Sequence, residues 1–371
     1  MEKKNKSERR YELDWLRIIT IIILFFYHSA KPFDMFDFHI NNYERDLGMT
    51  IFVAYLSSWM MPIFFLLSGM SIFYSLRKRE AGVFAKERIK RIMIPFIFGI
   101  LFLLSIHAYF EGVHKGWVTS TYFEFYAFRY FTLDVFPFEG YYLWYLWALF
   151  IFSILGLPIF LYFRKEENHE KIEKLANFIK KPGAILLLGI PLVLTELITY
   201  ALGLATFGFG GWQLPSYFII VIYGFLFASD EQFREIIEKN VVICAITAPI
   251  FSGLSGMAYF FIESIILYHI CLAFAGITWL TLIVGLANKY LNKKHDKLNF
   301  LNELVLPFYI LHQTIIVVIA FYIVGMQATI IAKYLFIVAI GIPITVGLVL
   351  LVRTNNVTRF LFGMRLKKKV E

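Results

Sequence analysis

The residues of this sequence that could do chemistry begin with a cation and an imidazole on one apolar segment. Ten residues separate Arg17 from His28. At about 100° per residue, eleven helical steps rotate to about 20°, so both side chains lie on one helix face, about 16 Å apart along the axis. Asp14 falls about 40° from His28 on the same stripe. This spacing predicts an Asp/Arg pair at one membrane surface and a histidine in the far half of the span.

These residue types suit transfer of a group from an anionic donor. An imidazole titrates near neutrality and can take a proton from an attacking hydroxyl, and a guanidinium can hold a phosphate. Arg88 and Arg91 lie three residues apart, as neighbours on a helix, at the predicted membrane face of Arg17. A donor with a long thin arm would then place its reactive end near His28. Two plainer interpretations stay open: a hydrogen-bonded packing histidine, and a collar of cations that reach the lipid headgroups.

Other ionisable residues within apolar segments are weaker candidates, because such groups are costly in a membrane and are often functional. His312 and its neighbour Tyr309 are supporting candidates, and Glu196 lies where an unpaired carboxylate would be expensive. Glu44 and Asp46 form a short acidic pair of the kind that binds a metal. Such pairs are frequent by chance, and we assign no metal ligands from the sequence.

The segments that carry these residues are membrane spans. The chain has 371 residues, of which 59% are hydrophobic and 17% charged, against roughly 25% charged in soluble proteins. Its mean hydropathy is +0.67. This composition excludes a soluble domain, a disordered chain and a disulfide scaffold. The length suits about ten spans of about 20 residues.

The predicted fold is therefore all-α: one polytopic membrane domain over 1–371, with about ten transmembrane helices and tails at 1–13 and 353–371. The spans are expected at 14–30, 50–75, 92–110, 142–163, 183–204, 216–228, 241–260, 264–288, 303–324 and 331–352.

The distribution of cations predicts the orientation of these spans. Lys and Arg accumulate in cytoplasmic loops. With the N-terminus inside, all but five of the 36 Lys and Arg residues fall on the cytoplasmic side. The exceptions are Lys31, Arg45, Lys115, Arg129 and Lys333. We therefore expect both termini in the cytoplasm and an even number of spans. The bias also explains the net charge of +9 without a nucleic-acid partner.

The external segment 117–147 is unusually aromatic, with 15 Phe, Tyr and Trp in 31 residues. An interfacial aromatic belt is one interpretation. A wall on which sugars stack is the other.

The motifs together resemble the acyltransferase-3 family of membrane acyltransferases. Arg17, ten residues and His28 match its leading motif, and Arg88-x-x-Arg91 followed by Pro95 matches its second. The resemblance is greatest to the branch of glucans biosynthesis protein C, a periplasmic glucan succinyltransferase. The supporting stretches, in order along nearly the whole chain, are YELDWLR (11–17), FFLLSG (64–69), LWYL (143–146), YGFLFASD (223–230) and FYILHQ (308–313).

The resemblance implies an enzyme of the prokaryotic inner membrane that takes acyl-CoA from the cytoplasm and acylates a glycan hydroxyl outside. The family's essential histidine corresponds to His28, and its arginines correspond to Arg17, Arg88 and Arg91. A histidine that commonly precedes the LWFL-like stretch is replaced here by Tyr142, so the acceptor can differ. No permanently bound cofactor is implied.

We therefore expect an O-acyltransferase that moves an acetyl or succinyl group from acyl-CoA to a glycan, with the lipid bilayer around it. Two other classes stay open. A glycosyltransferase that uses a lipid-linked sugar would need Glu44 and Asp46 and a metal, and would not bind acyl-CoA. A transporter without chemistry would keep its flux after loss of His28.

Overall fold

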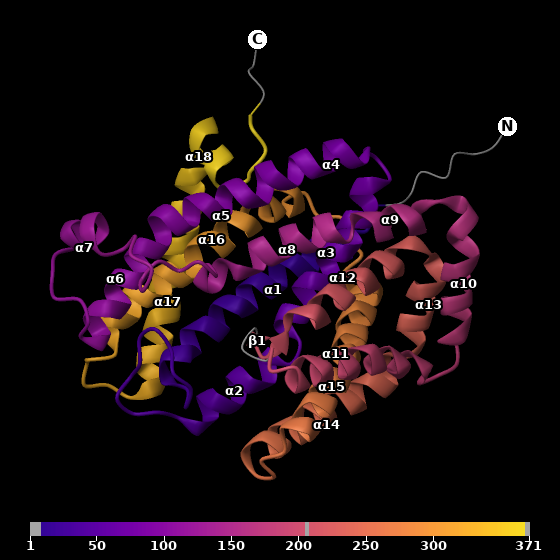
Figure 1. Cartoon of the computed structure of the whole chain (residues 1–371), viewed down its shortest axis with the longest axis horizontal. Coiled ribbons are helices and arrows are strands. Elements are labelled where there is room, and N and C mark those ends of the chain that lie inside the picture. Colours follow the sequence, from indigo (N-terminus) through magenta and orange to yellow (C-terminus); the bar gives the residue numbers. More distant parts are fainter. Residues whose placement is uncertain (1–8, 205–207, 368–371) are drawn as a thin grey trace.

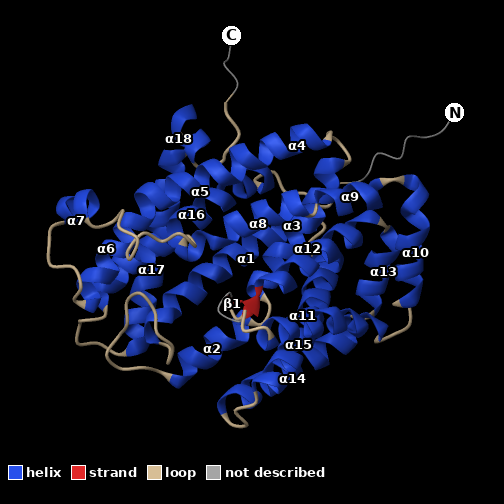
Figure 2. Ribbon diagram, in the orientation of Figure 1, coloured by secondary structure: helices blue, strands red, loops and turns tan. Residues whose placement is uncertain are grey.

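The computed structural model describes residues 9–204 and 208–367, and these are almost entirely helical (Figure 2). The described strands are β1 (Gly208–Phe209) and β2 (Trp212–Gln213), which pair antiparallel. The ends of the two predicted tails, 1–8 and 368–371, lie outside the described residues. The expected all-α architecture is confirmed.

Eight stretches of helix are long and apolar enough to cross a membrane, and two bent helix pairs raise the number to ten within the described residues. The eight stretches are α1 (Tyr11–Ala30) with η1 (Lys31–Phe33), α2 (Leu47–Ser57) with α3 (Met60–Leu76), α4 (Ala81–Arg88) through α6 (Leu104–Lys115), η6 (Ala184–Leu188) with α11 (Gly189–Ala201), α14 (Val241–Phe260), α15 (Ile265–Tyr290), α16 (Leu298–Ile323) and α17 (Ile330–Val352). The polytopic membrane fold predicted from composition is therefore present.

Two bent pairs account for the fourth and sixth predicted spans. η4 (Tyr141–Leu143) leads into α8 (Trp144–Leu155), and α9 (Leu157–Arg164) follows at an angle of 51°. α12 (Leu214–Ser229) ends in α13 (Glu231–Lys239), which turns back by 107°. α13 packs on α10 (His169–Phe178), which follows η5 (Glu166–Asn168). The remaining short helices are α7 (Tyr122–Phe128) and α18 (Asn356–Leu361).

The third predicted span, 92–110, starts earlier than expected and is not a regular α-helix. It runs from Ala81 to Lys115, with two π-helical segments, η2 (Ile89–Met93) and η3 (Gly99–Leu103), on either side of α5 (Ile94–Phe98). π-helical turns are rare and occur frequently at functional sites. Arg91 lies in the first of them, directly after the α4 turn that carries Arg88.

α1 crosses the middle of the helix assembly (Figure 1) and packs against α2, α3, α15, α16 and α17. Beside it, α3 and α12 approach so closely that a Cβ on Gly69 would lie 2.0 Å from the Val221 carbonyl oxygen. The reciprocal Cβ on Gly224 would lie 2.0 Å from the carbonyl oxygen of Leu66. Gly69 and Gly224 therefore form a close contact between α3 and α12. Close approach through small residues is a usual way to join helices where lipid provides no hydrophobic drive.

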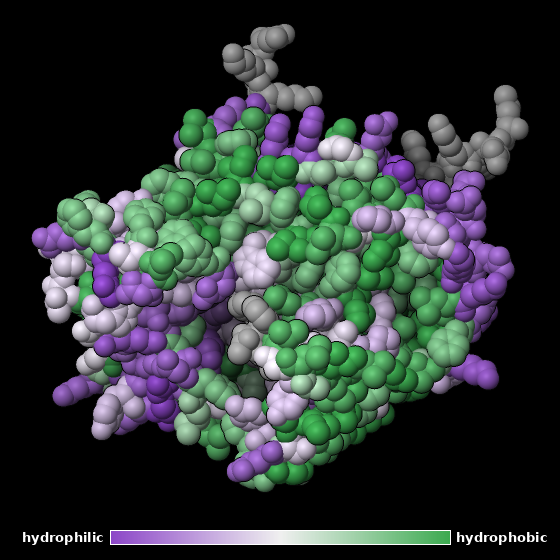
Figure 3. Space-filling view, in the orientation of Figure 1, coloured by the Kyte–Doolittle hydropathy of each residue, from purple (hydrophilic) through white to green (hydrophobic). Residues whose placement is uncertain are grey.

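The surface shows the polarity expected of a membrane protein. In Figure 3, polar residues gather at the lower left and along the upper right of the visible face, and a broad apolar band lies between them. The start of α1 and helix α18 both lie toward the upper side in Figure 1. This arrangement agrees with an even number of spans, and the cytoplasmic location of the termini stays a prediction.

Candidate functional site

The first predicted site residue, His28, lines a cavity of about 190 Å³. Its walls come from six places in the chain: α1, α2, the first turn of α3, the η4–α8 junction, the turn between β1 and β2, and α16. His28 lies in the last turn of α1. His28 therefore lies at the opposite end of α1 from Arg17, as the spacing predicted, and this end of the helix lines the cavity.

The His28 ring is held in place by other aromatic rings, and neither ring nitrogen has a hydrogen-bond partner among the described residues. Its Nδ1 is buried and has no hydrogen-bond partner among the described residues. Tyr27 contacts the ring edge-on at 4.9 Å, Phe38 stacks on it at 6.5 Å, and the His312 ring lies 5.2 Å away. The described part of the chain makes no hydrogen bond to Nε2 either, so this nitrogen remains available to a ligand in the cavity.

His312 supports His28 from behind and does not line the cavity. It is fully buried, and its Nδ1 lies 2.5 Å from the backbone carbonyl oxygen of Tyr309. Because a carbonyl only accepts, Nδ1 carries the proton and Nε2 keeps its lone pair. The secondary role expected for His312 fits this position.

Tyr142 and Tyr309 both line the cavity, as does Gln313. The Tyr142 hydroxyl donates to the carbonyl oxygen of Ile310 at 2.7 Å and contacts the Thr314 hydroxyl at 2.9 Å. The Tyr309 hydroxyl in turn donates to the Tyr142 carbonyl oxygen. These bonds join η4 to α16 across one wall of the site.

At the other end of α1, Arg17 is oriented by the acid predicted beside it. Its guanidinium donates to Asp14 at 2.9 Å and to the Ser71 hydroxyl at 2.5 Å. Asp14 also accepts from Arg9 at 2.6 Å and from the Asn302 amide at 2.9 Å. Asp14 thus holds Arg17 in place through a network that joins α1, α3 and α16.

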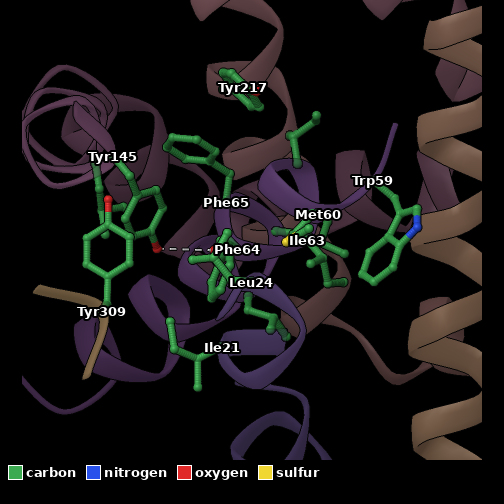
Figure 4. Close-up of a cluster of buried hydrophobic side chains, with 14 of the residues drawn as sticks. Ile21, Leu24, Trp59, Met60, Ile63, Phe64, Phe65, Tyr145, Tyr217 and Tyr309 are labelled. Atoms are coloured by element: carbon green, nitrogen blue, oxygen red, sulfur yellow. Dashed lines mark hydrogen bonds between the residues drawn. The ribbon is translucent and has the colours of Figure 1, made fainter. Parts of the chain in front are cut away.

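Tyr145 lies between the arginines and the cavity. Its hydroxyl is 2.7 Å from the Ser68 hydroxyl, and both Arg17 and Arg88 lie close enough to interact with it electrostatically. Its ring contacts Tyr309 at 5.6 Å. Figure 4 shows Tyr145 and Tyr309 side by side at the edge of the buried cluster, with the Tyr145 hydroxyl directed at Phe64. Tyr145 therefore connects the basic end of the site to the histidine end.

Arg88 and Arg91 have different surroundings. The Arg88 guanidinium covers the Phe84 ring at 4.6 Å. The backbone carbonyl of Arg91 packs against the segment around Gly363, and its side chain interacts with Arg365. Among the described residues neither arginine forms an ion pair. The two lie within electrostatic range of each other and of Glu87, which itself pairs with Arg79 at 3.2 Å.

Glu196, which the sequence places where an unpaired carboxylate would be costly, has partners for both oxygens. One oxygen accepts from the Gln213 backbone amide at 3.0 Å and from the Ser216 hydroxyl at 2.6 Å. The other lies 2.8 Å from His269 Nδ1. Glu196 therefore positions the β1–β2 turn. Gly210 in that turn lines the cavity with φ of 60°, and a Cβ there would approach Met61 to 3.0 Å.

The external segment 117–147 divides into two kinds of aromatic residue. Phe125 and Tyr130 are fully buried in a small core of their own, whereas Phe123 and Phe128 are each 82% exposed. The exposed rings fit an interfacial belt. Asp46 caps α2 by accepting from the Met49 amide at 2.7 Å, which engages one of the two carboxylates required by the glycosyltransferase alternative.

Several site residues were not predicted. Trp144, Tyr141, Ser57 and Met60 also line the cavity, and Tyr145 sits behind it. Tyr145 falls inside the LWYL stretch and Gln313 directly follows His312. Proximity to the motif residues was the one available signal for these two.

The chain matches a known protein family over nearly its whole length. The family model described as "Acyltransferase domain" matches residues 10–353. Glucans biosynthesis protein C from Escherichia coli (strain SMS-3-5 / SECEC) and from Shigella dysenteriae serotype 1 (strain Sd197) are each 26% identical over 189 residues. The protein of the same name from Escherichia coli (strain K12) is 25% identical. These alignments cover 50% of this chain and 48% of each relative, so the chain spans about half the length of the curated relatives it matches.

No solved structure matches the chain. The family match extends over nearly all spans and includes the helices that carry Arg17, His28, Arg88, Arg91 and His312. The chain therefore belongs to the acyltransferase-3 family of membrane acyltransferases.

Proposed function

We propose that this protein is an O-acyltransferase of a prokaryotic inner membrane that moves an acetyl group from cytoplasmic acetyl-CoA to a hydroxyl of an extracytoplasmic glycan. The observation that carries the proposal is the layout of α1. His28 lines a cavity near one end of this helix, and Arg17, oriented by Asp14, stands near the other.

The basic end would hold the phosphates of the donor. Arg88 and Arg91 have no acidic partner among the described residues, and guanidinium groups bind phosphate oxygens strongly. Arg17 and Arg88 converge on the Tyr145 hydroxyl. The thin pantetheine arm would pass this point by displacing the contact between Tyr145 and Ser68, and the thioester would then enter the cavity.

His28 would act as the general base. Its free Nε2 would take the proton of the acceptor hydroxyl while that oxygen attacks the thioester carbonyl carbon. The carbon–sulfur bond breaks, the proton passes from His28 to the departing thiolate, and the products are an ester and coenzyme A. A transient acyl-His28 followed by transfer to the same hydroxyl is the other order of events. The Gln313 amide, on the cavity wall, is available to donate to the developing oxyanion.

The cavity wall favours acetyl over succinyl. Apart from His28, its described lining consists of apolar, aromatic, hydroxyl, amide and glycine residues, with no Lys, Arg, Asp or Glu. A succinyl carboxylate buried here would meet no cation on the described cavity wall, and Lys31, which lies within electrostatic range of His28, already pairs with Asp34 at 2.6 Å. An unpaired carboxylate is costly in a low-dielectric site.

The test is acetyl transfer and acetyl-CoA hydrolysis by the purified full-length protein. We expect His28→Ala to lose activity by at least about 100-fold, the lower range for loss of a general base. His169→Ala, an exposed histidine on α10, is the matched control and should keep full activity. Unchanged turnover in a folded His28→Ala protein would overturn the proposal. Faster turnover of succinyl-CoA than of acetyl-CoA would overturn the choice of acyl group.

The acceptor is tested separately in cells. Mass spectrometry of surface glycans with and without the protein should show an acetyl increment that depends on His28. An added sugar instead of an acyl group would favour a glycosyltransferase.

A further inference from the structure

A second cluster of ligating side chains lies outside the proposed acyl-transfer site. His39 comes from the loop after η1, and His107 and Glu111 lie one turn apart on α6. Each offers one ligand atom, and the three atoms lie within 4.8 Å of one another. The two imidazole rings are perpendicular, with centroids 4.1 Å apart.

The cluster leaves donor atoms unsatisfied. His107 is fully buried, and neither ring nitrogen has a hydrogen-bond partner among the described residues. A buried polar group without a partner is destabilising. His39 Nδ1 lies 2.7 Å from one Glu111 oxygen. His107, whose ring nitrogens have no hydrogen-bond partner among the described residues, therefore lies beside the His39 imidazole and the Glu111 carboxylate.

The surroundings orient the ligands. Lys115 donates to the second Glu111 oxygen at 3.0 Å, and the backbone amide of Asn41 donates to His114 Nε2 at 3.1 Å. Lys115 also donates to Asp37 at 3.3 Å. The contacts of Asn41 and Asp37 therefore fasten the His39 loop to α6. Such outer partners fix the orientation of metal ligands in characterised sites.

We propose that His39, His107 and Glu111 bind a divalent transition-metal ion of the Zn²⁺ class. Two imidazoles and one carboxylate form the three-protein-ligand set of open zinc sites, in which the fourth position holds water or substrate. Imidazole ligands select this class over Mg²⁺ and Ca²⁺, which prefer oxygen. A modest inward shift of the three side chains would bring donors at this spacing to bonding distance.

Two residues, Phe38 and Tyr141, connect this cluster to the cavity that His28 lines. Phe38, which stacks on His28, is adjacent to His39. Tyr141 lines the cavity and also contacts His39 at 4.9 Å and His107 at 5.1 Å. Tyr141 has φ of 41°, a strained value for a bulky side chain. A metal at the cluster would hold the loop that covers His28.

Metal content tests the proposal without reference to acyl transfer. Full-length protein stripped with a chelator and re-equilibrated with Zn²⁺ should retain about one ion per chain by mass spectrometry of the metal. His107→Ala and Glu111→Gln should each bind Zn²⁺ at least about tenfold more weakly, the low end for disturbed metal sites. Co²⁺ in the wild-type protein should give visible bands typical of a four-coordinate site, and these should be lost in both variants.

The control removes a histidine from the other metal-sized cluster of the described chain, His169, Glu173 and Asp230. His169→Ala should keep the ion. Zn²⁺ should also raise the melting temperature of the wild-type protein and of His169→Ala, but not that of Glu111→Gln. Retention of no ion above background, or an ion that survives His107→Ala and Glu111→Gln, would overturn the proposal.

Discussion

The arginines at the basic end of the site differ in how many hydrogen bonds and ion pairs they already form. Arg17 already donates to Asp14 and Ser71, whereas Arg88 covers the Phe84 ring, has Glu87 within electrostatic range and forms no ion pair among the described residues. Arg88 is therefore the guanidinium with most capacity left for a ligand. The spacing of Arg17 and His28 was predictable because both lie on one helix. The contacts that Phe38, Ser71 and Tyr145 make with them were not, because these residues come from other elements and only tertiary packing brings them close. His312 was expected only as a supporting residue.

Arg88→Ala should raise the KM for the acyl-CoA donor by about 10–100-fold and change kcat little. A hydrogen bond to a charged group contributes about 1.5–3 kcal/mol, and loss of uniform binding appears in KM. Initial-rate kinetics over a range of donor concentrations measure both constants.

Lys90→Ala is the matched control, because Lys90 is exposed on the adjacent π-helical turn. It should leave both constants within about twofold of the wild-type values, as expected for a solvated charge. A fall in kcat at constant KM for Arg88→Ala would contradict donor binding by this residue.

The helices show which parts of the fold hydropathy can predict. Apolar runs gave the expected positions of α14 and α15 almost to the residue, because each is one uninterrupted helix. They could not predict the break between α2 and α3 at Ser58, nor the two π-helical segments beside Arg91. The residues on both sides of a helix break are equally apolar, so hydropathy does not reveal the break. A π-helical turn likewise has the same hydropathy as an α-helical turn of the same residues. These irregularities lie beside the site: Ser57 and Met60 both line the cavity.

The α3–α12 contact supports a stability prediction. Gly224→Ala should lower the free energy of unfolding by about 1–3 kcal/mol or more, because the new Cβ would lie 2.0 Å from a backbone oxygen that cannot rotate away. Thermal unfolding in detergent, followed by helical circular dichroism, measures the change.

Gly256→Ala in α14 provides the comparison. Nothing lies within 4 Å of a Cβ at this position, so the substitution should be neutral or stabilising by up to about 1 kcal/mol through helix propensity. Equal melting temperatures for the two variants would mean that α3 and α12 separate without cost.

On the scale of the whole molecule, the polar zones in Figure 3 give the assembly two faces. The cation count assigns one of them to the cytoplasm. That assignment stays a prediction, because it rests on the charges of the loops alone. Composition could not predict which loops fold back onto the helices, as the His39 loop does on α6.

Cysteine accessibility tests this orientation. Cys244 and Cys271 are buried and can be replaced by Ala to give a cysteine-free background. Leu133→Cys, at a position that is 86% exposed, should react with a membrane-impermeant maleimide in intact cells. Lys367→Cys and Lys174→Cys should react only after permeabilisation. The reverse pattern would invert the predicted topology.

The contact between Tyr145 and Ser68, with Tyr309 packed beside it, also matters for the proton gradient across the membrane. A pore wide enough for a thioester would let protons run down their gradient at every turnover. If the donor arm enters as proposed, it would displace these side chains in turn, and they would close again behind it. Under the proposed reaction, the acyl group alone would cross, carried by exchange of covalent bonds, and the proton-motive force would be kept.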